Sequence, residues 1–368
     1  MKRLSKNLSF AALFFIHFCS DSVGFAQESG VLNPSDAGDR LPEILKRFPN
    51  SDANKDGTLS REEAATFFSN RRQGREGAQG KRPSKRPDPT HADVRYGDHE
   101  KQAFDLWLVP GATEPTPLVL FIHGGGSRSG DKRTAAPTII GKCLEAGVAF
   151  AAMNYRLSDV GPYPMMMEDC ARGLQTIRHR AEEWNLIPEK VAAYGGTAGA
   201  GISLWLGFHD DLAKPDSSDP IARQSSRVAA AGSLNGQSTY DLRVFREWFA
   251  IPNLQPGPAL PAFYAITSNA DWESDRVKTL MTEASSITHL TKDDAPVYMI
   301  YSRPNTAVTE ETKSSVWVHH VKLGLELQKA MHKLGLECTV TGPDVKPVND
   351  PYGSLEDFLI QHVKRHPH

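Results

Sequence analysis

The chain has 368 residues, of which 39% are hydrophobic and 23% are charged, and its formal net charge is −2. This is the composition of an ordinary globular protein, and the length fits one large α/β domain as well as two or three smaller ones. A nucleic-acid-binding protein needs a basic footprint, which this nearly neutral chain lacks as a whole. We therefore expect no nucleic acid among its partners.

Residues 1–26 have the pattern of a secretory signal peptide. An apolar run from Leu8 to Phe18 follows three basic residues, Lys2, Arg3 and Lys6. Gly24 and Ala26 are the small residues expected before a cleavage site that follows Ala26. A membrane anchor is the alternative, but the run is shorter than the ~20 residues that span a bilayer. No later stretch is long and apolar enough to do so, and the sequence predicts a secreted or periplasmic protein.

The segment from Asp52 to Glu63 has the pattern of an EF-hand calcium loop. Ca²⁺ prefers six to eight oxygen ligands, which such a loop supplies from alternating positions. The expected ligands are Asp52, Asn54, Asp56, Thr58 through its carbonyl, Ser60 through a water, and Glu63 through both carboxylate oxygens. Gly57 stands at the sharp turn, where a Cβ is costly, and Leu59 supplies an apolar contact.

Helices are expected on both sides of this loop, within a unit spanning residues 38–70. Their apolar positions are Leu41, Ile44, Leu45 and Phe48 before the loop, and Ala64, Ala65, Phe67 and Phe68 after it. EF-hands usually pair, and a second loop is missing from the sequence. A role in stability or attachment is therefore easier to defend than a calcium switch. An acidic surface turn with chance spacing is the competing interpretation.

Residues 71–92 are rich in Arg, Lys, Gly and Pro without apolar periodicity, which predicts a basic flexible linker. A basic arm that touches an anionic wall or polysaccharide is an alternative. Residues 93–366 alternate strand-like and helix-like segments, which predicts a mostly parallel sheet flanked by helices. The three cysteines after the signal, Cys143, Cys170 and Cys338, are expected to be buried free thiols. No His, Asp or Glu spacing in this region resembles a metal site.

Two glycine-rich turns each follow a predicted strand. The strand Pro117–Ile122 runs into His123-Gly-Gly-Gly126, and the strand Lys190–Tyr194 runs into Gly195-Gly-Thr-Ala-Gly-Ala-Gly201 and an apolar helix. Free N–H groups in the first turn can stabilise an oxyanion. Strand, tight turn and helix are the context of a nucleophile elbow, G-x-S-x-G. Neither turn satisfies the dinucleotide pattern G-x-G-x-x-G.

From about residue 93 onward the chain resembles the hormone-sensitive-lipase-like and acetyl/feruloyl-esterase-like (BD-FAE-like) branch of the α/β-hydrolases. The resemblance rests on the HGGG run, on Asn154-Tyr-Arg-Leu157, and on the order and spacing of HGGG and the elbow. It implies an α/β-hydrolase fold and carboxylic ester hydrolysis, with no cofactor required at that site. It also implies that the N–H groups of Gly124, Gly125 and Ala198 form an oxyanion hole, and that Thr197 occupies the nucleophile position.

The sequence departs from this family at each member of the catalytic triad. Threonine replaces serine at position 197, and its β-branch restricts χ1. Asn305 stands where the acid is expected, after the predicted strand Pro296–Tyr301. The stretch 342–355, where the histidine should lie, contains none. His319 and His320 precede a predicted helix at 323–334 and are the remaining candidates for a base.

Three functions compete on these observations. The first is a hydrolase of a small-molecule or polysaccharide-linked ester with an unusual threonine nucleophile. The second is a pseudoenzyme that binds a ligand or partner without turnover. The third is a calcium-dependent structural or adhesion module. The aromatic segment 239–290 is either a cap over the pocket or ordinary packing around the sheet.

Overall fold

The computed structural model describes residues 86–365 continuously and, before them, residues 41, 45, 51–53, 55–60, 63 and 66. The chain divides into two compact units, residues 1–82 and 83–368. The predicted signal peptide at 1–26 lies outside the described residues, as do most of the linker and the helices predicted beside the calcium loop. The end of the predicted linker 71–92 differs from expectation. Arg86 pairs with Asp105 at 3.1 Å and the first strand begins at His91, so these residues belong to the larger unit.

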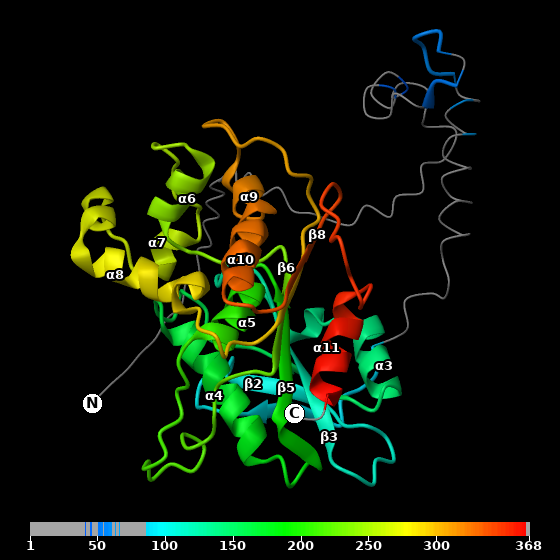
Figure 1. The fold of residues 1–368 in the computed structure, drawn as a ribbon, viewed down its shortest axis with the longest axis vertical. Coiled ribbons are helices and arrows are strands. Elements are labelled where there is room, and N and C mark those ends of the chain that lie inside the picture. Colours follow the sequence, from blue (N-terminus) through cyan, green and yellow to red (C-terminus); the bar gives the residue numbers. More distant parts are fainter. Residues whose placement is uncertain are drawn as a thin grey trace, which may run out of the picture. The chain divides into compact units, whose positions relative to one another are not determined.

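The larger unit is built on an eight-stranded sheet with the order β1-β2-β4-β3-β5-β6-β7-β8 (Figure 1). β2 runs antiparallel to both β1 and β4, and the remaining neighbours are parallel. The strands are β1 (His91–Arg95), β2 (Ala103–Trp107), β3 (Thr116–Ile122), β4 (Ala149–Met153), β5 (Leu186–Gly196), β6 (Ala230–Leu234), β7 (Val297–Ile300) and β8 (Cys338–Thr341).

Helices cover both faces of this sheet, as the sequence predicted. They are α3 (Pro137–Glu145), α4 (Met165–His179), α5 (Ala198–Phe208), α6 (Leu242–Phe249), α7 (Leu260–Phe263), α8 (Asp275–Ala284), α9 (Ser314–Trp317), α10 (Lys322–Lys333) and α11 (Leu355–Lys364). Short 3₁₀ turns are η4 (Lys132–Thr134), η5 (Asn269–Glu273) and η6 (Ser286–His289).

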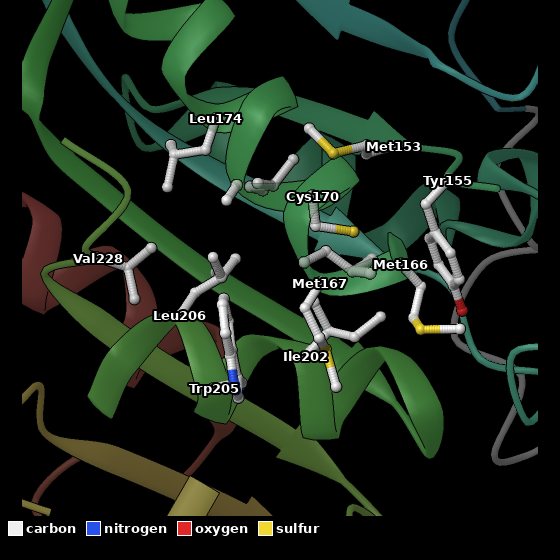
Figure 2. Packing of buried hydrophobic residues seen from close by; sticks show 14 of the residues in the cluster. Met153, Tyr155, Met166, Met167, Cys170, Leu174, Ile202, Trp205, Leu206 and Val228 are labelled. Carbon is white, nitrogen blue, oxygen red and sulfur yellow. The ribbon is translucent and has the colours of Figure 1, made fainter. Parts of the chain in front are cut away.

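The central strand β3 explains the two layers, because successive side chains of a strand point to opposite faces. Leu118, Leu120 and Ile122 pack in one buried cluster with α4 and α5, whereas Val119 and Phe121 pack in another with α3 and α11. Figure 2 shows the first cluster, in which Cys170 and Met167 of α4 face Ile202 of α5. Both faces of β3 are therefore covered, which is why this strand is apolar throughout.

The parallel strands end at the same edge of the sheet. Ile122 at the end of β3 is paired with Gly195 of β5, and Leu234 at the end of β6 is paired with Gly196. The next strands continue this alignment, since Leu234 also pairs with Ile300 of β7. Each loop that leaves these strands therefore starts at one edge, which is where ligand sites of open α/β sheets lie.

The described cysteines are free and buried, which confirms the expectation for Cys143, Cys170 and Cys338. Among the helices that the structure describes, none has the length and apolarity to cross a membrane.

Candidate active site and calcium loop

Thr197 occupies a strained turn between β5 and α5. Its φ of 45° and ψ of −108° lie outside the regions that a β-branched residue ordinarily adopts. The turn is held because the Thr197 N–H donates to the Leu234 carbonyl at 2.8 Å, and the Gly201 N–H donates to the Thr197 carbonyl at 3.0 Å. This is the strand-turn-helix geometry of a nucleophile elbow, and strain of this kind persists only where the surroundings over-determine it.

The elbow and the HGGG loop touch main chain to main chain. A Cβ at Gly199 would lie 2.1 Å from the Ile122 carbonyl oxygen, and one at Gly195 would lie 2.4 Å from the same atom. A Cβ at Gly124 would lie 2.7 Å from the Gly196 carbonyl oxygen. Real Cβ atoms do not approach oxygen so closely, so glycine at these positions is required for the two turns to meet.

The hydroxyl of Thr197 lies between these two turns. Its Oγ1 accepts a hydrogen bond from the Ala198 N–H at 2.5 Å. A Cβ built on Gly124 would lie 3.3 Å from the same oxygen, so this glycine is its neighbour. Thr197 caps α5, and the N-terminus of a helix stabilises negative charge. The structure thus brings Thr197, Ala198 and Gly124 together, as the sequence predicted.

Gly125 belongs to a tight reversal of the HGGG loop. Its φ is 105°, and a Cβ would lie 2.0 Å from the Ser129 carbonyl oxygen. The N–H groups of Arg128 and Ser129 both donate to the Gly125 carbonyl, at 3.1 and 3.3 Å. This carbonyl is therefore bound within the loop, and the assignment of the Gly125 N–H to an oxyanion hole stays a prediction.

His123 contacts the glycine loop through its buried ring. Its ring is buried and stacks on Tyr155 with centroids 4.4 Å apart, and the Tyr155 hydroxyl donates to the His123 carbonyl at 3.0 Å. Nδ1 lies 2.7 Å from the Gly124 carbonyl oxygen, to which it donates as a neutral imidazole. Burial lowers the pKa of His123. The histidine is therefore a structural support of the glycine turn.

Asn305 does not reach the elbow by any hydrogen bond. It is exposed in the loop after β7, and its N–H donates to both carboxylate oxygens of Asp344 at 2.9 Å. Asp344 lies in the loop after β8, where the family would carry its histidine. The loop after β7, expected to supply the acid, and the loop after β8, expected to supply the base, are thus joined to each other. The bond runs from the main-chain N–H of Asn305 to the Asp344 carboxylate.

The adjacent histidines are also engaged elsewhere. The ring of buried His320 donates from Nε2 to the Thr306 carbonyl at 2.8 Å and accepts at Nδ1 from the Lys322 N–H at 3.1 Å. His319 donates from Nδ1 to the Ser315 carbonyl at 2.9 Å. Across residues 86–365 no histidine hydrogen-bonds the Thr197 hydroxyl. Within this range the nucleophile position lacks a bonded base.

The segment 239–290 contributes both to the core and to the site. Tyr240 packs in the main core cluster, and a Cβ at Gly201 would lie 2.0 Å from its hydroxyl, so the ring abuts the first turn of α5. The loop before α7 contacts the glycine turn, since the Arg128 guanidinium donates to the Pro258 carbonyl at 3.2 Å. A Cβ at Gly126 would lie 3.3 Å from Ala259. The segment therefore packs in the core and contacts the glycine turn, and a cap over a pocket stays a prediction.

An ion pair joins Arg156, in the segment Asn154-Tyr-Arg-Leu157, to Asp169 of α4. Asp169 is 2% exposed and accepts from the main chain and guanidinium of Arg156 at 2.6 to 2.9 Å. The pair fixes the loop after β4 to α4. In the sequence, Glu168 and Asp169 are adjacent on one predicted helix and either could pair with an arginine. Spacing alone does not show which of the two carboxylates Arg156 binds.

In the N-terminal unit, the described part of the predicted calcium loop is a compact turn. The Asp52 carboxylate accepts from the N–H groups of Lys55 and Gly57 at 2.8 and 2.9 Å, and Gly57 has a φ of 85°. The Glu63 carboxylate accepts from the N–H and hydroxyl of Ser60 at 3.0 and 2.7 Å. The Glu63 N–H donates in turn to the Ser60 hydroxyl at 3.1 Å, so the two residues form a reciprocal pair of the capping-box type.

Other members of the predicted ligand set lie in the same turn. The Asp56 carboxylate accepts from the N–H and hydroxyl of Thr58 at 2.8 and 2.7 Å, and Leu59 is buried. Asn54 lies outside the described residues. Oxygen-bearing side chains around a left-handed glycine form a donor set that suits Ca²⁺, while calcium binding itself stays a prediction.

The parallel sheet, the elbow and the packed glycine loop define an esterase-type α/β-hydrolase. The chain belongs to the BD-FAE family, which matches residues 104–319. Its solved neighbours share the fold. A truncated carbohydrate esterase from gut microbiota has a TM-score of 0.58 and 16% identity, covering 77% of this chain and 100% of that one. The Est2 esterase of Thermogutta terrifontis has a TM-score of 0.53 and 18% identity, covering 76% and 92%.

Curated relatives are carboxylic ester hydrolases by name. A probable isoprenylcysteine alpha-carbonyl methylesterase of Arabidopsis thaliana is 28% identical over 39% of this chain and 30% of its own length. The probable carboxylic ester hydrolase LipM of Mycobacterium tuberculosis is 24% identical over 59% of this chain and 48% of its own length. The chain thus matches less than half of each of these relatives.

Proposed function

We propose that the protein is an exported esterase-type hydrolase whose altered triad leaves ester hydrolysis weak or absent. In this proposal the glycine turns still bind the ester group of a small-molecule or polysaccharide-linked ester. The observation that carries the proposal is the Thr197 hydroxyl, which is bonded by the Ala198 N–H and by no histidine of residues 86–365. Loss of a triad member costs several orders of magnitude in rate, and an oxyanion hole with binding alone leaves ~10³–10⁴-fold over water.

The test is hydrolysis of p-nitrophenyl acetate by the mature protein and by Thr197→Ala and Thr197→Ser. We expect slow turnover that Thr197→Ala changes by less than about tenfold, because a hydroxyl without a base is a weak nucleophile. Thr197→Ser should gain little for the same reason. A loss of about 100-fold or more in Thr197→Ala would instead establish Thr197 as a working nucleophile and overturn the proposal of lost chemistry.

Ligand binding is tested separately from turnover. Isothermal titration with an acetylated xylo-oligosaccharide should give more heat than its deacetylated form, because the proposed N–H groups are placed to bind an ester carbonyl, which the deacetylated sugar lacks. Equal binding of the two sugars would show that the glycine turns do not recognise the ester.

A calcium site at residues 52–63 is the second candidate function, and the turn in which the Gly57 N–H donates to the Asp52 carboxylate supports it. It would supply stability or attachment of the exported protein. We expect one Ca²⁺ per chain by titration, with affinity reduced at least about tenfold in Glu63→Gln because a bidentate ligand is lost. Asp159→Asn, an exposed carboxylate of the other unit, is the matched control. Unchanged calcium affinity in Glu63→Gln would reject the loop as the site.

Export is supported by the signal-like pattern of residues 1–26. N-terminal sequencing of the protein recovered from outside the cytoplasm should begin at Gln27. A protein that keeps Met1 and stays with the membrane would favour the anchor instead.

A further inference from the structure

We propose that His209, Glu283 and His289 form a binding site for a first-row divalent cation such as Zn²⁺. One ligand atom from each residue lies within 4.8 Å of the others. Two imidazoles and a carboxylate are a donor set that Zn²⁺ prefers. The three residues come from different elements: His209 follows α5, Glu283 lies on α8 and His289 ends η6. Their meeting is a property of the fold and could not be found from spacing in the sequence.

The spacing of the ligand atoms suits one small cation. His209 Nε2 and Glu283 Oε1 are 3.1 Å apart. Two ligands of a tetrahedral zinc with bonds of ~2.0–2.1 Å lie about 3.3 Å from each other. The His209 and His289 rings are close as well, with centroids 4.6 Å apart. The three ligand atoms lie within 4.8 Å of one another, so a side-chain movement of up to about 1.5 Å would close the set around a metal.

The remaining ring nitrogens are already bound in the manner of metal ligands. His209 Nδ1 lies 2.9 Å from the Asp210 carbonyl oxygen, and His289 Nε2 lies 2.7 Å from the Glu283 carbonyl oxygen. Metal-bound histidines commonly donate their second N–H to a carbonyl, which fixes the tautomer and the ring plane.

A cation between His209 Nε2 and the Glu283 carboxylate would remove a repulsion between these two atoms. If Nδ1–H donates to Asp210, a neutral ring turns the lone pair of Nε2 toward the Glu283 carboxylate. That contact is repulsive unless a proton or a metal ion lies between the two atoms. His289 offers a second imidazole ligand.

The scaffold around the cluster is firmly bonded. The Ser285 hydroxyl donates to the Met281 carbonyl at 2.6 Å and accepts from the Tyr240 N–H at 2.9 Å. The His209 ring stacks on Trp205, with centroids 4.0 Å apart. Rigid supports lower the cost of gathering ligands. The His209 and Glu283 side chains are 15% and 49% exposed, which gives an ion access and leaves room for a water as the fourth ligand.

The site would act on stability rather than on the ester. α5 runs from Ala198 to Phe208 with Thr197 as its N-cap, so its far end lies about 16 Å from the elbow. A cation there would tie this end of α5 to the turn between α8 and η6.

The experiment uses the full mature chain with saturating Ca²⁺, so that the predicted calcium loop cannot take up the added metal. Zn²⁺ is titrated by calorimetry and Co²⁺ by its visible absorption, and melting is followed in parallel. We expect one Zn²⁺ per chain and a melting temperature raised by roughly 5 °C at 100 times the dissociation constant. Glu283→Gln and His289→Gln should each weaken Zn²⁺ binding at least about tenfold, while exposed His179→Gln on α4 should bind as the wild type does.

Two outcomes would overturn the proposal. Absence of Zn²⁺ and Co²⁺ binding up to about 100 μM in the wild type would show that the three side chains do not form a metal site. Binding that persists undiminished in both variants would place the metal elsewhere. Neither outcome depends on ester turnover, so both are independent of the function proposed for the glycine turns.

Discussion

At the scale of single residues, Gly199 is the position where the site depends most directly on a missing side chain. Its Cβ would meet the carbonyl oxygens of Ile122 and His123 at 2.1 and 2.6 Å, and main chain cannot move aside as a flexible side chain can. We expect Gly199→Ala to reduce the free energy of unfolding by more than about 2 kcal/mol. The measurement is urea denaturation followed by tryptophan fluorescence.

Gly141 is the matched control for this substitution. It also lies in a helix, α3, but a Cβ there would meet nothing within 4 Å. Gly141→Ala should therefore stabilise the protein by up to about 1 kcal/mol, because alanine is the better helix former. If the two alanine variants shift the denaturation midpoint in the same direction, the close approach of the two turns does not limit stability.

At the scale of elements, the pair of Arg156 and Asp169 fastens α4 to the loop after β4. Arg156→Ala would leave the 2% exposed Asp169 carboxylate without its cation, which typically costs ~3–5 kcal/mol. Lys329→Ala removes the cation of a surface pair with Glu326, in which the lysine is 66% exposed, and should cost less than about 1 kcal/mol. Denaturation midpoints measure both, and similar losses in the two variants would contradict the buried pair's role.

The elements that sequence predicted well are those with a strong local pattern. β3 is a continuous apolar run, and the strand predicted at Pro117–Ile122 lies within a residue of its observed bounds. The sequence does not predict β6 (Ala230–Leu234), because Ala-Ala-Gly-Ser-Leu has little strand propensity. Its strand conformation depends on pairing with β5 and β7 on either side. The helical spacing of Met167 to Trp184 predicts a helix over that range, but α4 ends at His179 and the buried Trp184 lies in the following turn.

In the site, too, the main-chain turns were predictable from the sequence and the side chains on long loops were not. Thr197, Ala198 and Gly124 were found together because main-chain turns after paired strands must meet at one edge of a sheet. Which side chain reaches the threonine depends on long loops, whose paths no local pattern encodes. For this reason the engagement of His320 with Thr306, and of Asn305 with Asp344, could be read only from the structure.

At the scale of the whole molecule, the helix α11 near the end of the chain packs against α3, β3 and the strands that carry the site. The titration of His362 on this helix should make the free energy of unfolding depend on pH. Burial, followed by the charge of Arg365, lowers the pKa of His362 to about 4, against the opposing effect of Glu337. In the unfolded chain a histidine titrates near ~6.5. Between these values the unfolded state binds a proton that the folded state does not.

Folding stability should therefore be full above about pH 6.5 and fall as the pH drops toward 4, by at most about 1.4 kcal/mol per pH unit from this group. His362→Gln should remove that contribution, because glutamine does not titrate. The measurement is the difference between the two proteins' urea midpoints from pH 7 to pH 4.5, in which contributions from carboxylates common to both cancel. A difference that stays constant over this range would mean that His362 takes up its proton equally in the folded and unfolded chains, and that its burial in α11 has no part in acid stability.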